Sequence, residues 1–193
     1  MYIETVKPVD AEGTLKELYA RAGNPDGTID NVMLAHSLSP ESLMAHFNLY
    51  VQCMHRPSPL TRLERELVGS VVSRENACGY CLTHHAAGLE RLEAKAGRRG
   101  LAAAVRSGEE SSLLNERESS MVAYAVRLTR SPGEMGPGDV EGLRSAGLSD
   151  REILDLAQVT AYFCYANRIV LGLGAELEPF EAGQHPGGQS AGG

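Results

Sequence analysis

The sequence is poor in aromatic residues and in positive charge, and both shortages restrict the class of protein. Aromatics make up 5% of the 193 residues and tryptophan is absent, so a surface that stacks nucleic-acid bases is not expected. The formal net charge is -7 at pH 7, which argues against phosphate backbones and anionic lipids as partners. The sequence therefore predicts a protein that binds neither nucleic acid nor membrane.

Long hydrophobic runs are also missing. No stretch approaches the roughly 18 apolar residues of a membrane-spanning helix, and Met1 to Asp10 contains no apolar signal-peptide core. We therefore expect a cytoplasmic protein. In that reducing compartment the 4 cysteines are not expected to form a structural disulfide framework. A C-x-x-C pair there indicates redox chemistry or metal binding.

Alternating strand patterns are scarce, whereas helix starts are frequent. Thr61, Asn115 and Ser149 are each followed three positions later by glutamate, a capping box that predicts a helix start. The last of these helices is apolar nearly all the way round, as in a central helix or an oligomer interface. We predict one all-α domain over residues 1–180 and a flexible tail over residues 181–193. Other helices are expected over residues 14–22, from Ser39-Pro40 to before Pro57, and over residues 78–96, 101–106 and 140–145.

The residues best suited to chemistry lie between Cys78 and His85. Cys78 stands near an expected helix N-terminus, where free N–H groups and the helix dipole stabilise a thiolate. Cys81 lies within reach for disulfide formation with Cys78. His85 follows Cys81 by four residues, on the same helical face, and can take its proton. His84 points elsewhere and is expected to be structural.

An acid could orient or deprotonate the histidine, and the preceding helix offers several. Glu66 lies at the margin of the apolar stripe of that helix, from where it could face His85. Glu64 is accounted for as a cap partner and Glu75 as a helix-end residue. An isolated glutamate at such a margin is usually a solvated charge. The pattern alone does not choose Glu66 over Glu75.

Zinc is a competing use of the same atoms. Cys78, Cys81 and His84 or His85 would supply three ligands, with a fourth such as His55 from elsewhere. No second C-x-x-C or H-x-x-x-H closes such a site. A thioredoxin is excluded because no βαβ pattern surrounds the cysteines. No glycine-rich nucleotide-binding spacing appears, so we predict no cofactor.

Taken together, these motifs resemble the alkylhydroperoxidase D-like (carboxymuconolactone decarboxylase-like) superfamily. Its redox-active members share a glutamate, a C-x-x-C twelve residues later, and a histidine four residues after the second cysteine. Glu66, Cys78, Cys81 and His85 fit that spacing without a gap. Similarity in the segments around Ser39 and over residues 147–154 and 161–168 is typical of the branch of uncharacterised peroxidase-related enzymes.

The resemblance implies an all-helical fold that assembles into dimers, trimers or hexamers. It also implies peroxidase activity on a hydroperoxide, with a thiol reductant restoring the enzyme. Cys81 would be the attacking thiol, activated through His85 and Glu66, and Cys78 would resolve it into a disulfide. The resemblance thus makes Glu66 the relay acid.

One position departs from the family pattern. The characterised reductase has a histidine inside its C-x-x-C, where this chain has Tyr80. Two alternatives to a peroxidase stay open at this point. One is a redox-sensing or small-molecule-binding protein of the same fold, and the other is the zinc site at Cys78, Cys81 and His85.

Overall fold

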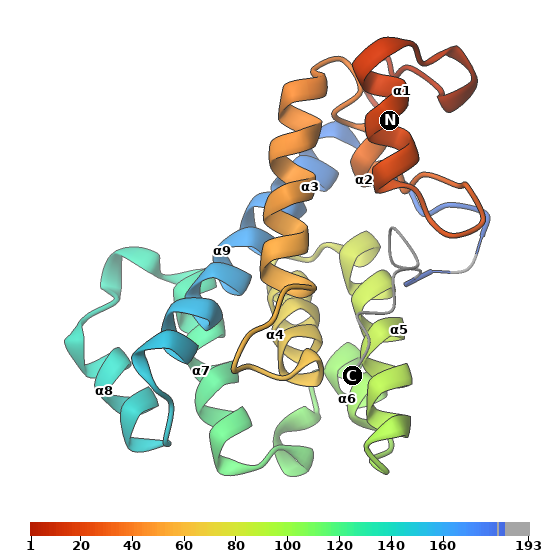
Figure 1. The fold of residues 1–193 in the computed structure, drawn as a ribbon. Helices are drawn as coiled ribbons and strands as arrows, with labels where there is room; N and C mark the ends of the chain where they lie inside the picture. Colours follow the sequence, from red (N-terminus) through yellow and green to blue (C-terminus); the bar gives the residue numbers. More distant parts are fainter. Residues whose placement is uncertain (181, 184–193) are drawn as a thin grey trace.

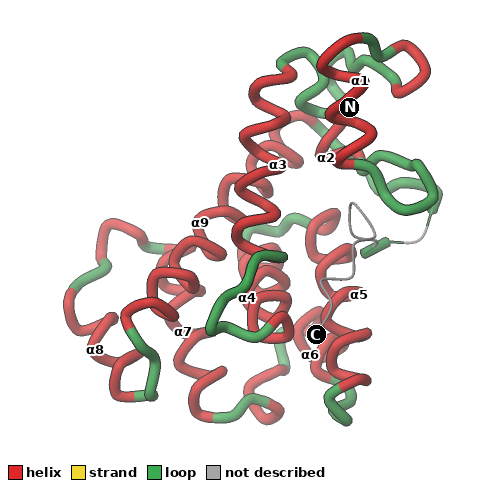
Figure 2. Tube along the Cα trace, viewed as in Figure 1, coloured by secondary structure: helices red, strands yellow, loops and turns green. Residues whose placement is uncertain are grey.

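The computed structural model describes residues 1–180, 182 and 183. Within these residues all regular structure is helical and no strand occurs, which confirms the predicted all-α class (Figure 2). The tail predicted over residues 181–193 lies outside the described residues, apart from 182 and 183. The α-helices are α1 (Gly13–Ala22), α2 (Asn31–Leu34), α3 (Pro40–Met54), α4 (Arg62–Glu75), α5 (Gly79–Lys95), α6 (Leu101–Ser107), α7 (Glu116–Arg130), α8 (Pro137–Ser145) and α9 (Asp150–Leu173), with short 3-10 turns at Pro8–Asp10, Glu110–Leu113 and Pro132–Glu134.

The three predicted capping boxes are present at the starts of α4, α7 and α9. In each, the cap side chain accepts from the backbone N–H three residues later, and the glutamate there accepts from the cap N–H. α3 also begins where expected, with Pro40 first, but the Ser39 side chain makes no capping hydrogen bond. The four-residue helix α2 was not predicted, because so short a segment has no measurable periodicity.

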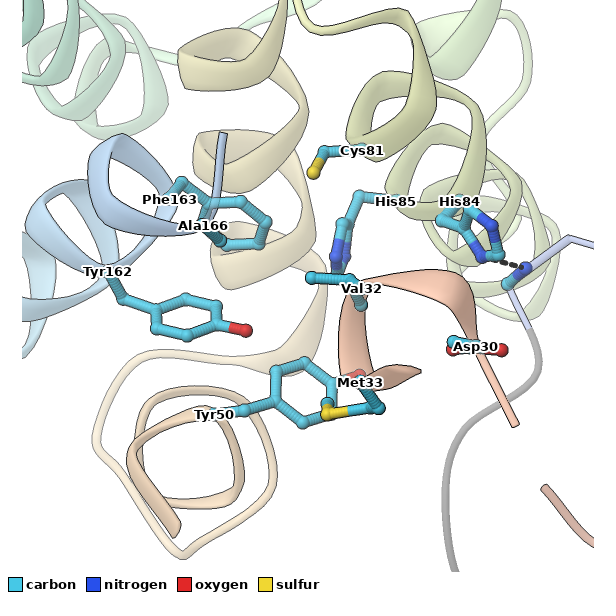
Figure 3. Close-up of a pocket in the computed structure, with 11 residues that line it drawn as sticks. Asp30, Val32, Met33, Tyr50, Cys81, His84, His85, Tyr162, Phe163 and Ala166 are labelled. Carbon is cyan, nitrogen blue, oxygen red and sulfur yellow. Dashed lines mark hydrogen bonds between the residues drawn. The ribbon is translucent and has the colours of Figure 1, made fainter. Parts of the chain in front are cut away.

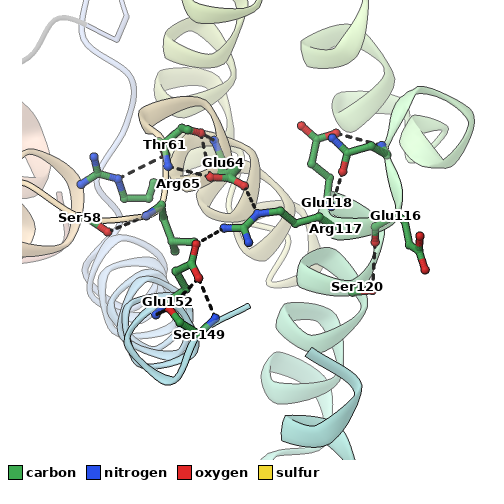
Figure 4. Close-up of polar contacts among 12 residues, drawn as sticks. Ser58, Thr61, Glu64, Arg65, Glu116, Arg117, Glu118, Ser120, Ser149 and Glu152 are labelled. Carbon is green, nitrogen blue, oxygen red and sulfur yellow. Dashed lines mark hydrogen bonds and ion pairs between the residues drawn. The ribbon is translucent and has the colours of Figure 1, made fainter. Parts of the chain in front are cut away.

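The capping boxes also connect three helices to one another through Arg117. Its Nε donates to Glu64 at 2.7 Å and its Nη2 donates to Glu152 at 2.7 Å (Figure 4). Glu64 and Glu152 are the cap glutamates of α4 and α9, and Arg117 lies in the first turn of α7. One guanidinium therefore ties together the N-termini of α4, α7 and α9.

Helix α4 is the centre of the molecule. It packs against α3, α5, α6, α7 and α9, and every residue from Glu64 to Ser73 is buried. Two glycines permit this close approach. A Cβ on Gly69 would lie 2.4 Å from the Phe163 ring of α9, and one on Gly88 of α5 would lie 3.2 Å from the Glu66 carboxyl carbon. Small residues thus let α5 and α9 close over α4.

The long helix α9 packs against α3, α4 and α7. Figure 1 shows α1 and α2 near its C-terminal end and α7 and α8 near its N-terminal end. The Tyr2 N–H donates to the Leu173 carbonyl at 2.7 Å, which fixes the start of the chain to this helix. Leu154 and Leu171 remain 52% and 48% exposed on α9. Among the described residues, no helix is both long and apolar enough to cross a membrane.

Candidate functional site

The two cysteines of the C-x-x-C lie at the turn between α4 and α5. After Glu75 the chain makes hydrogen bonds from the Ala77 N–H to the Arg74 carbonyl (2.9 Å) and from the Cys78 N–H to the Ser73 carbonyl (2.8 Å). This is a Schellman motif, and Ala77 takes the left-handed conformation it requires, with φ 54°. The turn makes Cys78 the N-cap of α5 and puts Cys81 in its first turn.

The two thiols lie against each other. They are free cysteines that approach to 3.5 Å, and both are buried. The hydrogen bond from Cys81, together with backbone N–H groups at the helix start, lowers the pKa of Cys78 to about 7. The same contact and burial raise the pKa of Cys81 well above its ordinary value. Of the two sulfurs, Cys78 is therefore the one whose surroundings favour the thiolate.

Glu66 and His85 form a direct pair one helix apart. His85 Nδ1 lies 2.7 Å from Glu66 Oε2, while Arg62 Nη2 donates to Glu66 Oε1 at 2.7 Å. Arg62 also donates to the Met54 carbonyl. Because a carboxylate accepts the Nδ1 hydrogen, Nε2 is the ring nitrogen left for proton exchange.

Glu66 is fully buried, whereas an isolated glutamate at the margin of an apolar stripe is usually solvated. The difference arises because α5 covers that side of α4 at Gly88, which has no side chain to keep it away. A wheel of α4 alone contains no information on the helix that packs against it. The buried charge is compensated by Arg62 on one oxygen and by the His85 imidazole on the other.

A small cavity of about 40 Å³ lies beside these groups. Cys81 and His85 both line it, whereas Cys78 does not, so Cys81 is the sulfur that a ligand in the cavity meets first. Figure 3 shows both side chains directed toward the same space as the aromatic rings of α3 and α9. The apolar lining consists of Val32, Met33, Tyr50, Tyr162, Phe163 and Ala166. Such a wall favours a small, largely apolar ligand with few polar groups.

His84 also lines the cavity, where we expected it to point elsewhere. Its Nε2 lies 2.9 Å from Glu178, and the Gly183 N–H donates to its Nδ1 at 3.1 Å. Both ring nitrogens are thereby occupied, which agrees with a structural role. Glu178 follows the last helix and carries no motif, so the sequence offered no signal for it.

Tyr80, the residue inside the C-x-x-C, belongs to this second cluster. Its hydroxyl donates to Glu178 at 2.5 Å and accepts from the Val32 N–H at 3.3 Å. Burial acts in the opposite direction, but hydrogen bonds from His84, Asn31 and Tyr80 lower the pKa of Glu178. Tyr80 therefore holds the segment after α9 against α5 and α2.

Asn167 of α9 is a further contact of the thiols that sequence reasoning did not find. It is fully buried, and its side chain lowers the pKa of both Cys78 and Cys81. Asn76 donates to its Oδ1 at 3.0 Å, so its Nδ2 hydrogens are the ones available to sulfur and to Ser73. An amide donor at this place favours the thiolate form of Cys78.

The geometry gives no support to the zinc alternative. Among residues 1–180, 182 and 183, no three His, Cys, Asp or Glu side chains are arranged to hold a metal ion. His55, the suggested fourth ligand, lies after α3 with its ring centroid 5.0 Å from that of Tyr50. His85 is directed to a carboxylate at 2.7 Å.

Solved structures with the same helical arrangement identify the family. An uncharacterized peroxidase-related protein from Silicibacter sp. TM1040 is 34% identical, with 82% of this chain and 81% of that chain covered and a TM-score of 0.74. The chain belongs to the alkylhydroperoxidase D-like superfamily. No protein-family model matches it, and no curated protein matches its sequence.

Two other members of this fold extend the comparison. The alkylhydroperoxidase D core protein from Ralstonia eutropha JMP134, also peroxidase-related and uncharacterized, is 24% identical over 96% of this chain and 97% of that one, with a TM-score of 0.83. The debrominase Bmp8 is 18% identical over 91% of each chain, with a TM-score of 0.75. At these identities the two structures show the alkylhydroperoxidase D-like fold alone.

Proposed function

We propose that this alkylhydroperoxidase D-like protein is a thiol-dependent hydroperoxidase and disulfide oxidoreductase. The observation that carries the proposal is the 2.7 Å bond between His85 Nδ1 and Glu66 beside a cavity that both His85 and Cys81 line. The 3.5 Å approach of Cys78 to Cys81 supports it further. Peroxidase-related proteins among the structural relatives agree with this reaction class.

In the proposed first step, Cys81 attacks the terminal oxygen of a hydroperoxide. The O–O bond breaks, the sulfur becomes a sulfenic acid, and the other oxygen leaves as the alcohol. Contact with Cys78 and burial raise the pKa of Cys81 well above its ordinary value, which favours the protonated thiol. It therefore needs a base, and Nε2 of His85 takes the proton and returns it to the leaving oxygen.

In the second step Cys78 attacks the sulfenic acid of Cys81, forming the disulfide and releasing water. The lowered pKa of Cys78, about 7, suits this role because the resolving sulfur is already a thiolate near neutral pH. Two equivalents of an external thiol then reduce the disulfide and are themselves oxidised to a disulfide. The partners are accordingly a hydroperoxide and a thiol reductant.

Cysteine variants test this mechanism. With dithiothreitol as reductant, Cys81→Ser should reduce the rate of peroxide consumption at least about 100-fold, because the sulfur that attacks oxygen is gone. Cys78→Ser should prevent formation of the disulfide, so peroxide added without reductant should leave a sulfenic acid on Cys81, detected by dimedone labelling and mass spectrometry. Cys164→Ser is the control, since Cys164 lies on α9 outside the cavity, and it should turn over normally.

The outcomes separate the competing functions. If Cys78→Ser and Cys81→Ser both keep wild-type rates, the thiol mechanism is wrong. If peroxide oxidises the pair once, without turnover under excess dithiothreitol, the protein is a redox sensor.

Reductive dehalogenation is a second candidate, favoured by one pair of observations. Bmp8 is a debrominase, and a cysteine-to-alanine variant of it in complex with 2,3,4-tribromopyrrole has the same fold as this chain, with a TM-score of 0.73. In the present chain three aromatic rings line the cavity beside Cys81, which is compatible with a planar ring. Bromide release from 2,3,4-tribromopyrrole, with peroxide turnover measured in parallel, distinguishes the two activities.

A further inference from the structure

A chain of buried polar groups leads away from the cavity, separate from the cysteines and from Glu66. The Tyr162 hydroxyl lies 3.1 Å from His46 Nε2, and His46 Nδ1 lies 3.2 Å from His36 Nε2. His36 Nδ1 in turn lies 2.9 Å from the Val32 carbonyl oxygen. His46 is 2% exposed, so water does not replace either partner of its ring.

The backbone carbonyl at the end of the chain determines the direction of every hydrogen bond in it. A carbonyl only accepts, so His36 donates from Nδ1. Burial lowers the pKa of His36, and burial with the neighbouring His36 lowers that of His46 to about 3, so both rings are neutral at pH 7. A neutral His36 then has a lone pair at Nε2, which faces both the Tyr165 hydroxyl, at 3.1 Å, and His46 Nδ1, at 3.2 Å. The Tyr165 hydrogen can rotate, but His46 Nδ1 avoids placing a second lone pair against His36 Nε2 only by carrying the hydrogen, so His46 donates from Nδ1. His46 Nε2 therefore accepts, and its donor is the Tyr162 hydroxyl.

This assignment has a consequence for the cavity, which Tyr162 lines. Figure 3 shows its hydroxyl directed toward the space beside His85 and Val32. Burial raises the pKa of Tyr162 well above its ordinary value, so the group keeps its proton. That proton is committed to His46, and among the described residues no donor is directed at the hydroxyl oxygen. The oxygen can only accept a hydrogen bond from a ligand.

We propose that Tyr162 is the substrate-orienting residue of the cavity and selects ligands that present an O–H group. His46 and His36 act as positioning residues, because they fix the direction of the Tyr162 proton. This inference rests on the proposed function, since a hydroperoxide is the ligand class that offers a terminal O–H beside an apolar group. Donating to His46 also strengthens the tyrosine oxygen as an acceptor through hydrogen-bond cooperativity.

A matched pair of ligands tests the proposal without any turnover. The probes are tert-butyl hydroperoxide and tert-butyl methyl ether, which have nearly the same shape but differ in the terminal O–H. Binding is measured by NMR titration of the Cys78→Ser/Cys81→Ser protein, which cannot react. We expect the hydroperoxide to bind about five- to tenfold more tightly than the ether, the ratio expected for one hydrogen bond.

Substitutions then assign the preference to the Tyr162 hydroxyl. In the same background, Tyr162→Phe should remove the preference for the hydroperoxide. Tyr165→Phe is the matched control on the same helix: its hydroxyl also reaches His36 Nε2, at 3.1 Å, but it does not line the cavity, so the preference should persist. The proposal would be overturned if the Tyr162→Phe protein kept the full preference for the hydroperoxide. It would also be overturned if the Tyr165→Phe protein lost that preference.

The direction of the hydrogen bonds from Tyr162 through His46 to His36 can be measured separately. Nitrogen-15 NMR should find the hydrogen of His46 on Nδ1 at pH 7, and a hydrogen on Nε2 would contradict the inference.

In otherwise unmodified protein, Tyr162→Phe should raise KM for tert-butyl hydroperoxide about five- to tenfold and change kcat by less than about threefold. If the wild-type protein turns over no hydroperoxide while the ligand preference and the His46 state are as expected, the proposed function fails and the present inference stands.

Discussion

Glu66 shows how single residues set the chemistry of this site. Its carboxylate is fully buried, and its two oxygens are divided between Arg62 and His85. Removing a carboxylate in this position leaves a guanidinium without its charged partner and an imidazole without its acceptor. The buried carboxylate that costs free energy of folding is therefore the same group that holds His85 for its proposed role.

A prediction at the residue scale concerns the negative charge of Glu66. Glu66→Gln keeps the side-chain size but should lower peroxide turnover on the order of 100-fold, because the amide no longer stabilises protonated His85. Glu64→Gln on the same helix is the control, since Glu64 serves the α4 cap and contacts Arg117 instead of the cavity. Equal rates for Glu66→Gln and the wild type would remove the carboxylate from the mechanism.

At the scale of the elements, the site depends on how closely α5 approaches α4. The Glu66 carboxylate occupies the space where a side chain at position 88 would be, with its two oxygens 3.3 Å from an ideal Cβ there. The two helices share the Glu66–His85 bond across this contact. A displacement of a few tenths of an ångström between α4 and α5 therefore acts on the His85 ring directly.

The element-scale prediction uses this contact. Gly88→Ala should push the Glu66 carboxylate away, lowering peroxide turnover about tenfold and the free energy of unfolding by roughly 1–3 kcal/mol. Gly142→Ala in α8 is the control, since its Cβ would have no heavy atom within 4 Å. That change should leave the rate of peroxide turnover unchanged and raise the free energy of unfolding by about 0.5–1 kcal/mol. Turnover and urea denaturation of the two variants measure the difference, and a Gly88→Ala protein as active and stable as wild type would contradict it.

For the molecule as a whole, the buried histidine pair couples folding to pH. His46 on α3 and Tyr162 on α9 join these two helices, and His36 connects them to α2 through the Val32 carbonyl. Because the pKa of His46 is lowered to about 3, the unfolded chain binds a proton below its ordinary pKa of about 6.5 while the folded protein does not. The stability associated with His46 is therefore complete above pH 6.5 and falls as the pH drops toward 3.

The whole-molecule prediction follows from that sign. Between pH 7 and pH 4.5 the wild type should lose on the order of 2–3 kcal/mol through His46 alone, seen as a lower urea midpoint. His46→Gln retains hydrogen-bonding capacity but does not titrate, so it should lose less stability over this interval. Identical pH dependence in both proteins would show that His46 is protonated in the folded state.

Assembly is a separate property of the whole molecule. The exposed Leu154 and Leu171 of α9 are compatible with a homo-oligomer, which stays a prediction.

Much of the fold could be predicted from local patterns. The boxes at Thr61, Asn115 and Ser149 depend on contacts within one turn, and the structure contains all three. The all-α class follows from the helical periodicity, and the spacing from Glu66 to His85 identified the superfamily that the comparison with solved structures confirms. These features lie within a short stretch of chain, where sequence and geometry are directly related.

Tertiary packing decided what local spacing does not contain. It buried Glu66 beneath Gly88 and brought Tyr162 to the cavity next to Cys81. It also formed the hydrogen bond between Glu178 and His84, which are 94 positions apart in the sequence. Each of these depends on which faces of α4, α5 and α9 meet. The sequence by itself determined most of the helices and the spacing from Glu66 to His85 that indicates the family, because these features lie within short stretches of chain. The cavity and its hydrogen-bond directions were decided only by the packed structure, because they arise between helices that are distant in the chain.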